Sequence, residues 1–202
     1  MEAFVSLSAT AAPIDIPNCD TDQIIPARFL RHLHTDGGYD RYLFHDLRFD
    51  DTGGEREGFV LNQAAFRSAE IIVADVNWGC GSSRENAVDA LLAFGIRCVI
   101  APSFGDIHYN NCINRGVLPI RLPRETCDQL RAKLHSSPGS EISISLEAQS
   151  IDDADGQRYT FEIAEFDKFR LLRGLDDVGL TLEYEGAIEQ FEARHSEHYD
   201  WL

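Results

Sequence analysis

NWGCGSSREN, residues 77–86, follows the apolar run of residues 71–74 and combines two glycines, two adjacent serines and an Arg-Glu pair. Glycine adopts backbone angles that other residues avoid, so Gly79 and Gly81 predict a turn from a buried strand into a helix, with room for a ligand to approach the backbone. The N–H groups at a helix start favour an anion, and the fork of Arg84 suits a carboxylate. The stretch is therefore predicted to be an anion-binding loop.

The same residues also fit a purely structural role. Ser82 followed by Glu85 matches the S-x-x-E pattern of a capping box, which begins a helix without any chemistry. The two interpretations are compatible, because a residue that orients a helix can also face a ligand. Other phosphate or nucleophile loops do not match: position 84 is Arg where G-x-G-x-x-G needs glycine, and G-x-x-x-x-G-K and G-x-S-x-G are both missing.

Strand-like and helical stretches alternate on either side of this loop. Apolar runs at residues 71–76, 96–101 and 117–122 predict strands, and residues 83–94 and 103–114 predict helices that end at Gly95 and Gly116. This order is βαβαβ, which predicts a parallel sheet with helices over it. Ligands bind at the carboxyl ends of such strands, where the 77–86 loop is expected to lie.

The rest of the chain has a different pattern. Residues 141–150 and 157–166 alternate polar and apolar positions on either side of residues 152–156, so they predict an antiparallel hairpin. Residues 18–51 predict loops around one or two short elements. The C-terminal tail from about residue 167 is expected to be helical in parts and broken at glycines, namely Gly174, Gly179 and Gly186. No linker divides residues 1–202, so we expect one α/β domain.

Length and charge exclude several classes of partner. A chain of 202 residues with 44% hydrophobic residues is long enough for a sizeable core, and its net charge is −16. Such a surface repels phosphate backbones and anionic lipids, so neither nucleic acid nor a membrane is an expected partner. The chain starts without a basic stretch ahead of an apolar run and has no 18 consecutive apolar residues, which predicts a cytoplasmic protein.

The cysteine pattern predicts neither disulfides nor a metal cluster, and Cys98 and Cys112 are predicted to be buried free thiols. The cysteines are five in number, at least 14 positions apart, and never form C-x-x-C, which is neither a disulfide framework nor a zinc or iron–sulfur signature. They are Cys19, Cys80, Cys98, Cys112 and Cys127. The histidines His108, His195 and His198 are interpreted as surface or supporting residues rather than metal ligands. No metal site is expected in this chain, and any iron must be held by another one.

Four stretches together resemble one known family. They are NWGCGSSREN, NCDTDQIIPARFL at 18–30, VIAPSFGDIHYNNCINRGVLPI at 99–120 and GLDDVGLTLEYEGAIEQFE at 174–192. In this order and with similar gaps, they resemble the small subunits of 3-isopropylmalate dehydratase, the separate swivelling domain of the aconitase superfamily. The resemblance covers nearly the whole chain and implies a single swivelling β/β/α domain of the aconitase type.

The resemblance also implies a reaction and a partner. Members of the family isomerise 2-isopropylmalate and 3-isopropylmalate by dehydration and rehydration in leucine biosynthesis, together with a cysteine-rich, aconitase-like large subunit that holds a [4Fe–4S] cluster. It implies that Ser82 is the base in its alkoxide form and that Ser83 and Arg84 bind a carboxylate of the dicarboxylate substrate. The resemblance further implies that neighbouring residues support this substrate site. They are Thr21, Asp22, Gly79, Gly81 and Glu85.

Three positions depart from the family pattern, so the identity of the substrate is not fixed by the resemblance. Asn86 stands where many relatives have His, Cys19 where many have Val or Ile, and Gly105 where Ala is usual. The alternatives are a related dehydratase for citramalate, dimethylmalate or homocitrate-like acids, and a non-catalytic anion-binding module of the same fold. Residues 28–44 resemble the flexible segment that sorts substrates in the family, although their basic residues and glycines also suit an ordinary surface.

Overall fold

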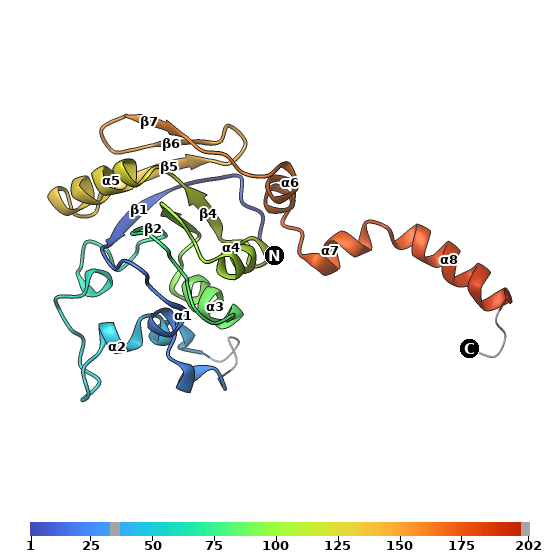
Figure 1. Cartoon of the computed structure of the whole chain (residues 1–202), viewed down its shortest axis with the longest axis horizontal. Helices are drawn as coiled ribbons and strands as arrows, with labels where there is room; N and C mark the ends of the chain where they lie inside the picture. Colours follow the sequence, from blue (N-terminus) through green and yellow to red (C-terminus); the bar gives the residue numbers. More distant parts are fainter. Residues whose placement is uncertain (33–36, 199–202) are drawn as a thin grey trace.

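The computed structural model describes residues 1–32 and 37–198, and its centre is a curled, seven-stranded mixed sheet (Figure 1). The strand order is β4-β3-β2-β1-β5-β6-β7. The strands are β1 (Ser6–Ile14), β2 (Ile71–Ala74), β3 (Cys98–Ala101), β4 (Leu118–Arg121), β5 (Glu141–Ser145), β6 (Ser150–Asp152) and β7 (Arg158–Thr160). The half from β4 to β1 is parallel, and the half from β1 to β7 is antiparallel. The predicted α/β fold with a parallel βαβαβ core is confirmed.

The helices cover both faces of the parallel half. They are α1 (Thr21–Ile24), α2 (His45–Arg48), α3 (Glu85–Phe94), α4 (Asp106–Arg115), α5 (Arg124–Ser136), α6 (Glu165–Arg173), α7 (Asp177–Leu182) and α8 (Glu185–His198), with 3₁₀ turns at Ala27–Phe29, Tyr39–Tyr42 and Val60–Asn62. Alternate residues of β2 and β3 enter two separate cores. Helix α3 shares one core with α1 and the loops of residues 25–69, and α5 packs on the other face.

The predicted core elements are present with shifted starts. Helix α3 begins at Glu85 rather than at residue 83, and α4 begins at Asp106 rather than at residue 103. Both helices end as predicted, because Gly95 and Gly116 adopt left-handed φ values of 108° and 87° that close a helix without strain.

The predicted hairpin has different strands from those expected. Residues 141–150 are not one strand, because the chain turns after β5 and returns as β6, with Gln149 at a φ of 51°. The hairpin around residues 152–156 does form, but it joins β6 to β7, and Asp152 pairs with Arg158. The antiparallel part is therefore a three-stranded meander, whose middle strand is too short to show its own alternation in the sequence.

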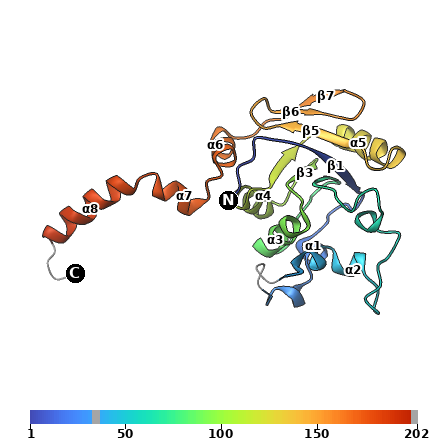
Figure 2. The same cartoon turned by 180° about the vertical axis from the view of Figure 1, so that it is seen from behind.

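The C-terminal tail is helical, but only one of its three predicted breaks is correct. Helix α6 ends at Gly174, whereas Gly179 lies inside α7 and Gly186 inside α8. The N–H of Gly179 donates to the side chain of Asp176, which caps α7. In both views α7 and α8 project away from the sheet (Figure 2). In the part of the chain that the structure describes, no helix is long and apolar enough to cross a membrane.

Candidate active site

Two loops that are distant in sequence are joined side by side at the carboxyl ends of the strands. The N–H of Gly79 donates to the carbonyl of Cys19 at 2.7 Å, and the N–H of Thr21 donates to the carbonyl of Cys80 at 3.0 Å. The buried hydroxyl of Thr21 then donates to the carbonyl of Ser82 at 2.9 Å. The loop of residues 77–84 is thus fixed on the start of α1, and it lies at the carboxyl ends of the strands, where the βαβ pattern predicted it.

Both glycines of the loop adopt backbone angles that require glycine. The φ values of Gly79 and Gly81 are 68° and 92°, as their sequence context predicted. A Cβ on Gly79 would lie 2.2 Å from Cδ2 of His108, so the imidazole lies directly against this backbone. A Cβ on Gly105 would lie 2.6 Å from the carbonyl oxygen of Gly79, so the backbone packs too closely here for a larger residue to fit without a shift.

Gly79→Ala is expected to lower the free energy of unfolding by about 2–5 kcal/mol, because it adds a clash in a packed interior to a left-handed backbone cost. The matched control is Gly81→Ala, whose Cβ would approach its nearest neighbour only to 3.6 Å. The control carries the backbone cost alone, about 1–2 kcal/mol. Urea unfolding of the whole chain measures both values, and equal losses would mean that His108 does not restrain the loop.

The capping-box interpretation is wrong. Helix α3 begins at Glu85 with Arg84 as its N-cap, and no side-chain hydrogen bond caps this end. The helix starts two residues later than the pattern requires, so Ser82 cannot reach the amides that a capping serine would accept from. Ser82 therefore lies in the loop before the helix, and its side chain is available for another role.

Arg84 places a positive charge where the loop of residues 77–84 meets the start of α1. Its Nη1 donates to the Oδ1 of Asp22 in an ion pair and lies 3.5 Å from the carbonyl oxygen of Ile25. The side chain of Arg84 is 14% exposed, whereas that of Asp22 is 55% exposed. The guanidinium is thus held against α1 by a carboxylate that remains open to water.

The two serines of the loop face solvent in the isolated chain. Ser82 and Ser83 are both exposed, and so is Glu85 at the first position of α3. Beside them, Asp20 caps α1: its side chain accepts from the N–H of Gln23 at 2.8 Å, and the side chain of Gln23 accepts from the N–H of Asp20. Asp20 and Gln23 thus form a capping box at the start of α1.

Asn86, which departs from the family pattern, has a hydrogen-bond partner in the structure. The amide nitrogen of Asn86 donates to the hydroxyl of Tyr39 at 3.0 Å, which links the start of α3 to the segment of residues 28–44. Residues 33–36 of that segment lie outside the described residues, so its predicted role as a substrate-sorting loop stays a prediction. The departure at Cys19 places a fully buried thiol in the core beside α1.

The cysteines do not fit an iron–sulfur cluster. All five are free, and burial raises the pKa of each thiol, to about 12 for Cys19 and Cys127. An iron–sulfur cluster needs several cysteine thiolates close to one another. Within residues 1–32 and 37–198, no three His, Cys, Asp or Glu side chains gather as a metal site would require.

His108 is not a surface residue, contrary to one of the two roles predicted for it. Its side chain is only 2% exposed, and burial lowers its pKa to about 4. The imidazole is thus neutral at pH 7 and supports the loop by contact, not by charge. His195 contacts the ring of Phe191 on α8, and the side chain of His198 lies outside the described residues.

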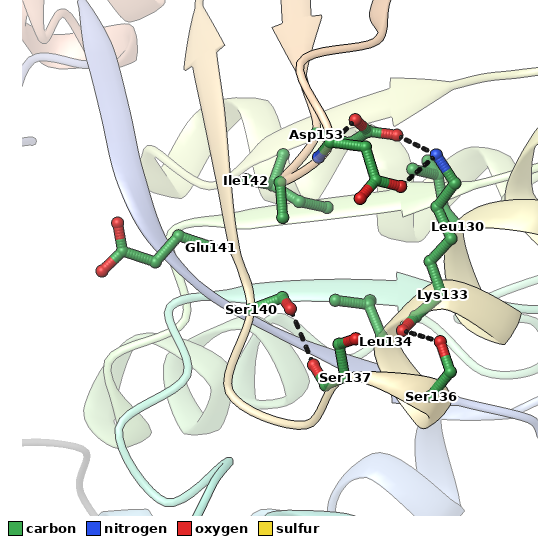
Figure 3. A pocket seen from close by; sticks show the side chains of 11 residues that line it. Leu130, Lys133, Leu134, Ser136, Ser137, Ser140, Glu141, Ile142 and Asp153 are labelled. Carbon is green, nitrogen blue, oxygen red and sulfur yellow. Dashed lines mark hydrogen bonds and ion pairs between the residues drawn. The ribbon is translucent and has the colours of Figure 1, made fainter.

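A cavity of about 180 Å³ lies away from this loop, between the end of α5, the start of β5 and the turn of residues 153–155 (Figure 3). The ammonium of Lys133 contacts Asp153 at 2.7 Å and Asp155 at 2.8 Å, and Glu141 adds a third carboxylate to the lining. These two aspartates raise the pKa of Lys133. The lining is net negative, which disfavours a dicarboxylate in this cavity.

Sequence reasoning missed two contacts of the candidate site. Tyr39 is 47 positions from Asn86, and His108 is 29 positions from Gly79, so no local pattern connects either pair. The only available signal was the paired glycines, which indicated that something approaches the backbone closely without naming it.

Comparisons with known proteins agree along the chain. The family described as Aconitase C-terminal domain matches residues 1–125, LeuD_N matches 128–165, and the C-terminal domain of the 3-isopropylmalate dehydratase small subunit matches 177–202. The 3-isopropylmalate dehydratase small subunit of Rhodospirillum centenum is 49% identical over 201 residues, which are 100% of this chain and 98% of that protein. The corresponding protein of Roseobacter denitrificans is 47% identical over 202 residues, with 100% of both chains covered. A crystal structure of 3-isopropylmalate dehydratase from Methanocaldococcus jannaschii has a TM-score of 0.65 and 27% identity, covering 93% of this chain and 99% of that one.

Proposed function

Because the chain belongs to the 3-isopropylmalate dehydratase small-subunit family, we propose that it is one half of a hydro-lyase that acts only with a large subunit. The reaction removes water from 2-isopropylmalate and adds it back in the other orientation, through 2-isopropylmaleate, to give 3-isopropylmalate in leucine biosynthesis. The observation that supports this function is the loop in which the exposed Ser82 and Ser83 precede Arg84, whose guanidinium is held by Asp22.

The base of the reaction is Ser82. The C–H bond next to a carboxylate is weakly acidic, so its proton must be taken by a base held close to it. An alkoxide is costly in water, but the N–H groups at the start of α3 and the charge of Arg84 both favour a negative oxygen. These effects are stronger in a site that excludes water. Since Ser82 is exposed in the isolated chain, a second surface must cover the loop before the base is effective.

Ser83 and Arg84 hold a carboxylate of the substrate. A guanidinium has five N–H donors in one plane, and the contacts of Arg84 with Asp22 and Ile25 are made by Nη1. Donors on Nη2 and Nε remain for an incoming carboxylate. Asp22 therefore acts as a positioning residue, because it restricts the guanidinium without occupying the whole fork.

The Lewis acid for the departing hydroxyl comes from the partner. The thiols of this chain do not fit a cluster, so we assign a [4Fe–4S] cluster to a cysteine-rich, aconitase-like large subunit, where it would polarise the bond to the leaving oxygen. The assembled enzyme is proposed to work in the cytoplasm, where its dicarboxylate substrate is a free metabolite.

The test is reconstitution with the large subunit under anaerobic conditions. The pair is expected to form 2-isopropylmaleate from both isopropylmalates, and the ultraviolet absorption of 2-isopropylmaleate measures the rate. Each subunit alone is expected to be inactive. Treated with iron and sulfide, this chain alone is expected to stay colourless. A stoichiometric cluster on this chain, or a pair that dehydrates citramalate but neither isopropylmalate, would contradict the proposal.

A further inference from the structure

The two last helices form an arm, residues 177–196, that leaves large apolar side chains in solvent. In both cartoons α7 and α8 project from the sheet beyond α6, and α8 lies farthest from the sheet (Figures 1 and 2). Val178, Leu182 and Tyr184 are 67%, 57% and 69% exposed, and Ile188 and Phe191 are exposed as well. A contiguous apolar surface of this kind usually marks a site of interaction.

Apolar side chains at the start of α8 lie on one face. Tyr184 lies in the turn directly before α8, and its carbonyl oxygen accepts from the N–H of Ile188 at 3.0 Å. Tyr184, Ile188 and Phe191 therefore stand at i, i+4 and i+7 and follow a single stripe. Three exposed acids, Glu185, Glu189 and Glu192, follow the same spacing and lie beside this stripe. An apolar stripe with an acidic border fits an apolar groove that has a basic rim.

The arm is anchored to the body of the chain at its root. Arg170 of α6 donates to Asp177 at 2.8 Å, and Arg173 contacts Glu183 at 3.0 Å. Asp176 caps α7 through the N–H of Gly179. The first helix of the arm is therefore anchored to α6, while its apolar residues Val178 and Leu182 remain exposed.

Charge excludes a second copy of this chain as the occupant of the stripe. The arm carries five acids and one arginine, and the whole chain has a net charge of −16. Two such surfaces repel one another. The favoured partner is a different protein with lysines and arginines around an apolar groove.

The residues matched by each protein family indicate which partner protein binds the arm. The Aconitase C-terminal domain family matches residues 1–125 and LeuD_N matches residues 128–165. The C-terminal domain family of the 3-isopropylmalate dehydratase small subunit matches residues 177–202, which begin at the first residue of α7. A small subunit needs a surface that binds its large subunit, and the arm lies in a segment that the small-subunit family matches and the aconitase domain family does not.

We propose that the arm docks this chain on the large subunit, with Tyr184, Ile188 and Phe191 in an apolar groove whose rim is basic. The inference rests on the proposed function and names the surface by which the pair assembles. Aromatic residues that are buried on binding carry much of the affinity of protein interfaces. The arm thus sets the affinity of the pair, and the loop of residues 77–84 sets the chemistry.

The experiment compares the whole chain with the double variant Ile188→Ser, Phe191→Ser in titrations against the purified large subunit. The dissociation constant is expected to rise at least about thirtyfold, which is about 2 kcal/mol. At saturating variant, kcat of the pair is expected to equal that of wild type, because the catalytic loop is unchanged. The matched control is Val5→Ser, which removes an apolar side chain of 51% exposure from the body and should leave the affinity unchanged.

A charge-reversal variant gives a second readout. Replacing Glu185, Glu189 and Glu192 with Lys is expected to weaken binding at least tenfold at low salt and to reverse the effect of added salt. An affinity within threefold of wild type for both arm variants would overturn the proposal, as would a dimer of this chain alone that the double variant abolishes. A wild-type pair that binds tightly and has no activity would instead overturn the proposed function, and the arm result would still stand.

Discussion

Ser82→Ala is expected to lower kcat of the reconstituted enzyme by about 10²–10⁴-fold, the usual contribution of a positioned acid–base group. The stability of the chain should change by less than about 0.5 kcal/mol, as for other exposed side chains away from a structural feature. That second expectation follows from the structure, because Arg84 and not Ser82 occupies the N-cap of α3. Loss of turnover therefore cannot be attributed to loss of a helix cap.

The measurement is the rate at which the substrate C–H exchanges with deuterium in the reconstituted complex, and NMR monitors this exchange. Ser83→Ala is the internal control: it removes a hydroxyl from the neighbouring exposed position, and it should raise KM more than it slows proton transfer. Both variants are expected to assemble with the large subunit at wild-type affinity. Exchange at the wild-type rate in Ser82→Ala would show that another group takes the proton.

The parallel core was predictable because its signals are local. Each strand is a short apolar run, and Gly95 and Gly116 mark the ends of α3 and α4. Strand β1 was not predicted, since SLSATAAPI is rich in Ser and Ala and its partners, β2 and β5, begin only at residues 71 and 141. Helix α5 was also missed: its core-facing residues are few, and Pro123 precedes it without a side-chain cap.

The sequence predicted which residues form the candidate site better than it predicted the contacts between them. The glycine angles at positions 79 and 81 follow from residue type, because only glycine adopts them freely. Whether Ser82 caps the helix depended on a shift of two residues in the helix start, and local propensity does not fix a helix end so closely. The ion pair of Arg84 with Asp22 joins positions 62 residues apart, so only the fold reveals it.

Arg84→Lys is expected to raise KM and to lower kcat/KM of the reconstituted pair by about tenfold to a thousandfold, or about 1.4–4 kcal/mol. Lysine keeps one positive charge but loses the planar fork. In the structure the ion pair with Asp22 already engages Nη1, so the substrate must use the other donors of the guanidinium. An ammonium at this position has a single donor atom, and Asp22 would compete for it directly.

The matched control is Arg158→Lys, because Arg158 also pairs with an aspartate, although it uses two nitrogens, Nε and Nη2, which donate to Asp152 at 2.7 and 2.8 Å. That pair lies on β7, at the far end of the sheet from the loop, so its variant should show wild-type kinetics. Adding Asp22→Asn to Arg84→Lys should recover part of the lost kcat/KM, since the ammonium is then released from its competitor. Wild-type kinetics in Arg84→Lys, or no recovery in the double variant, would mean that the substrate carboxylate is bound elsewhere.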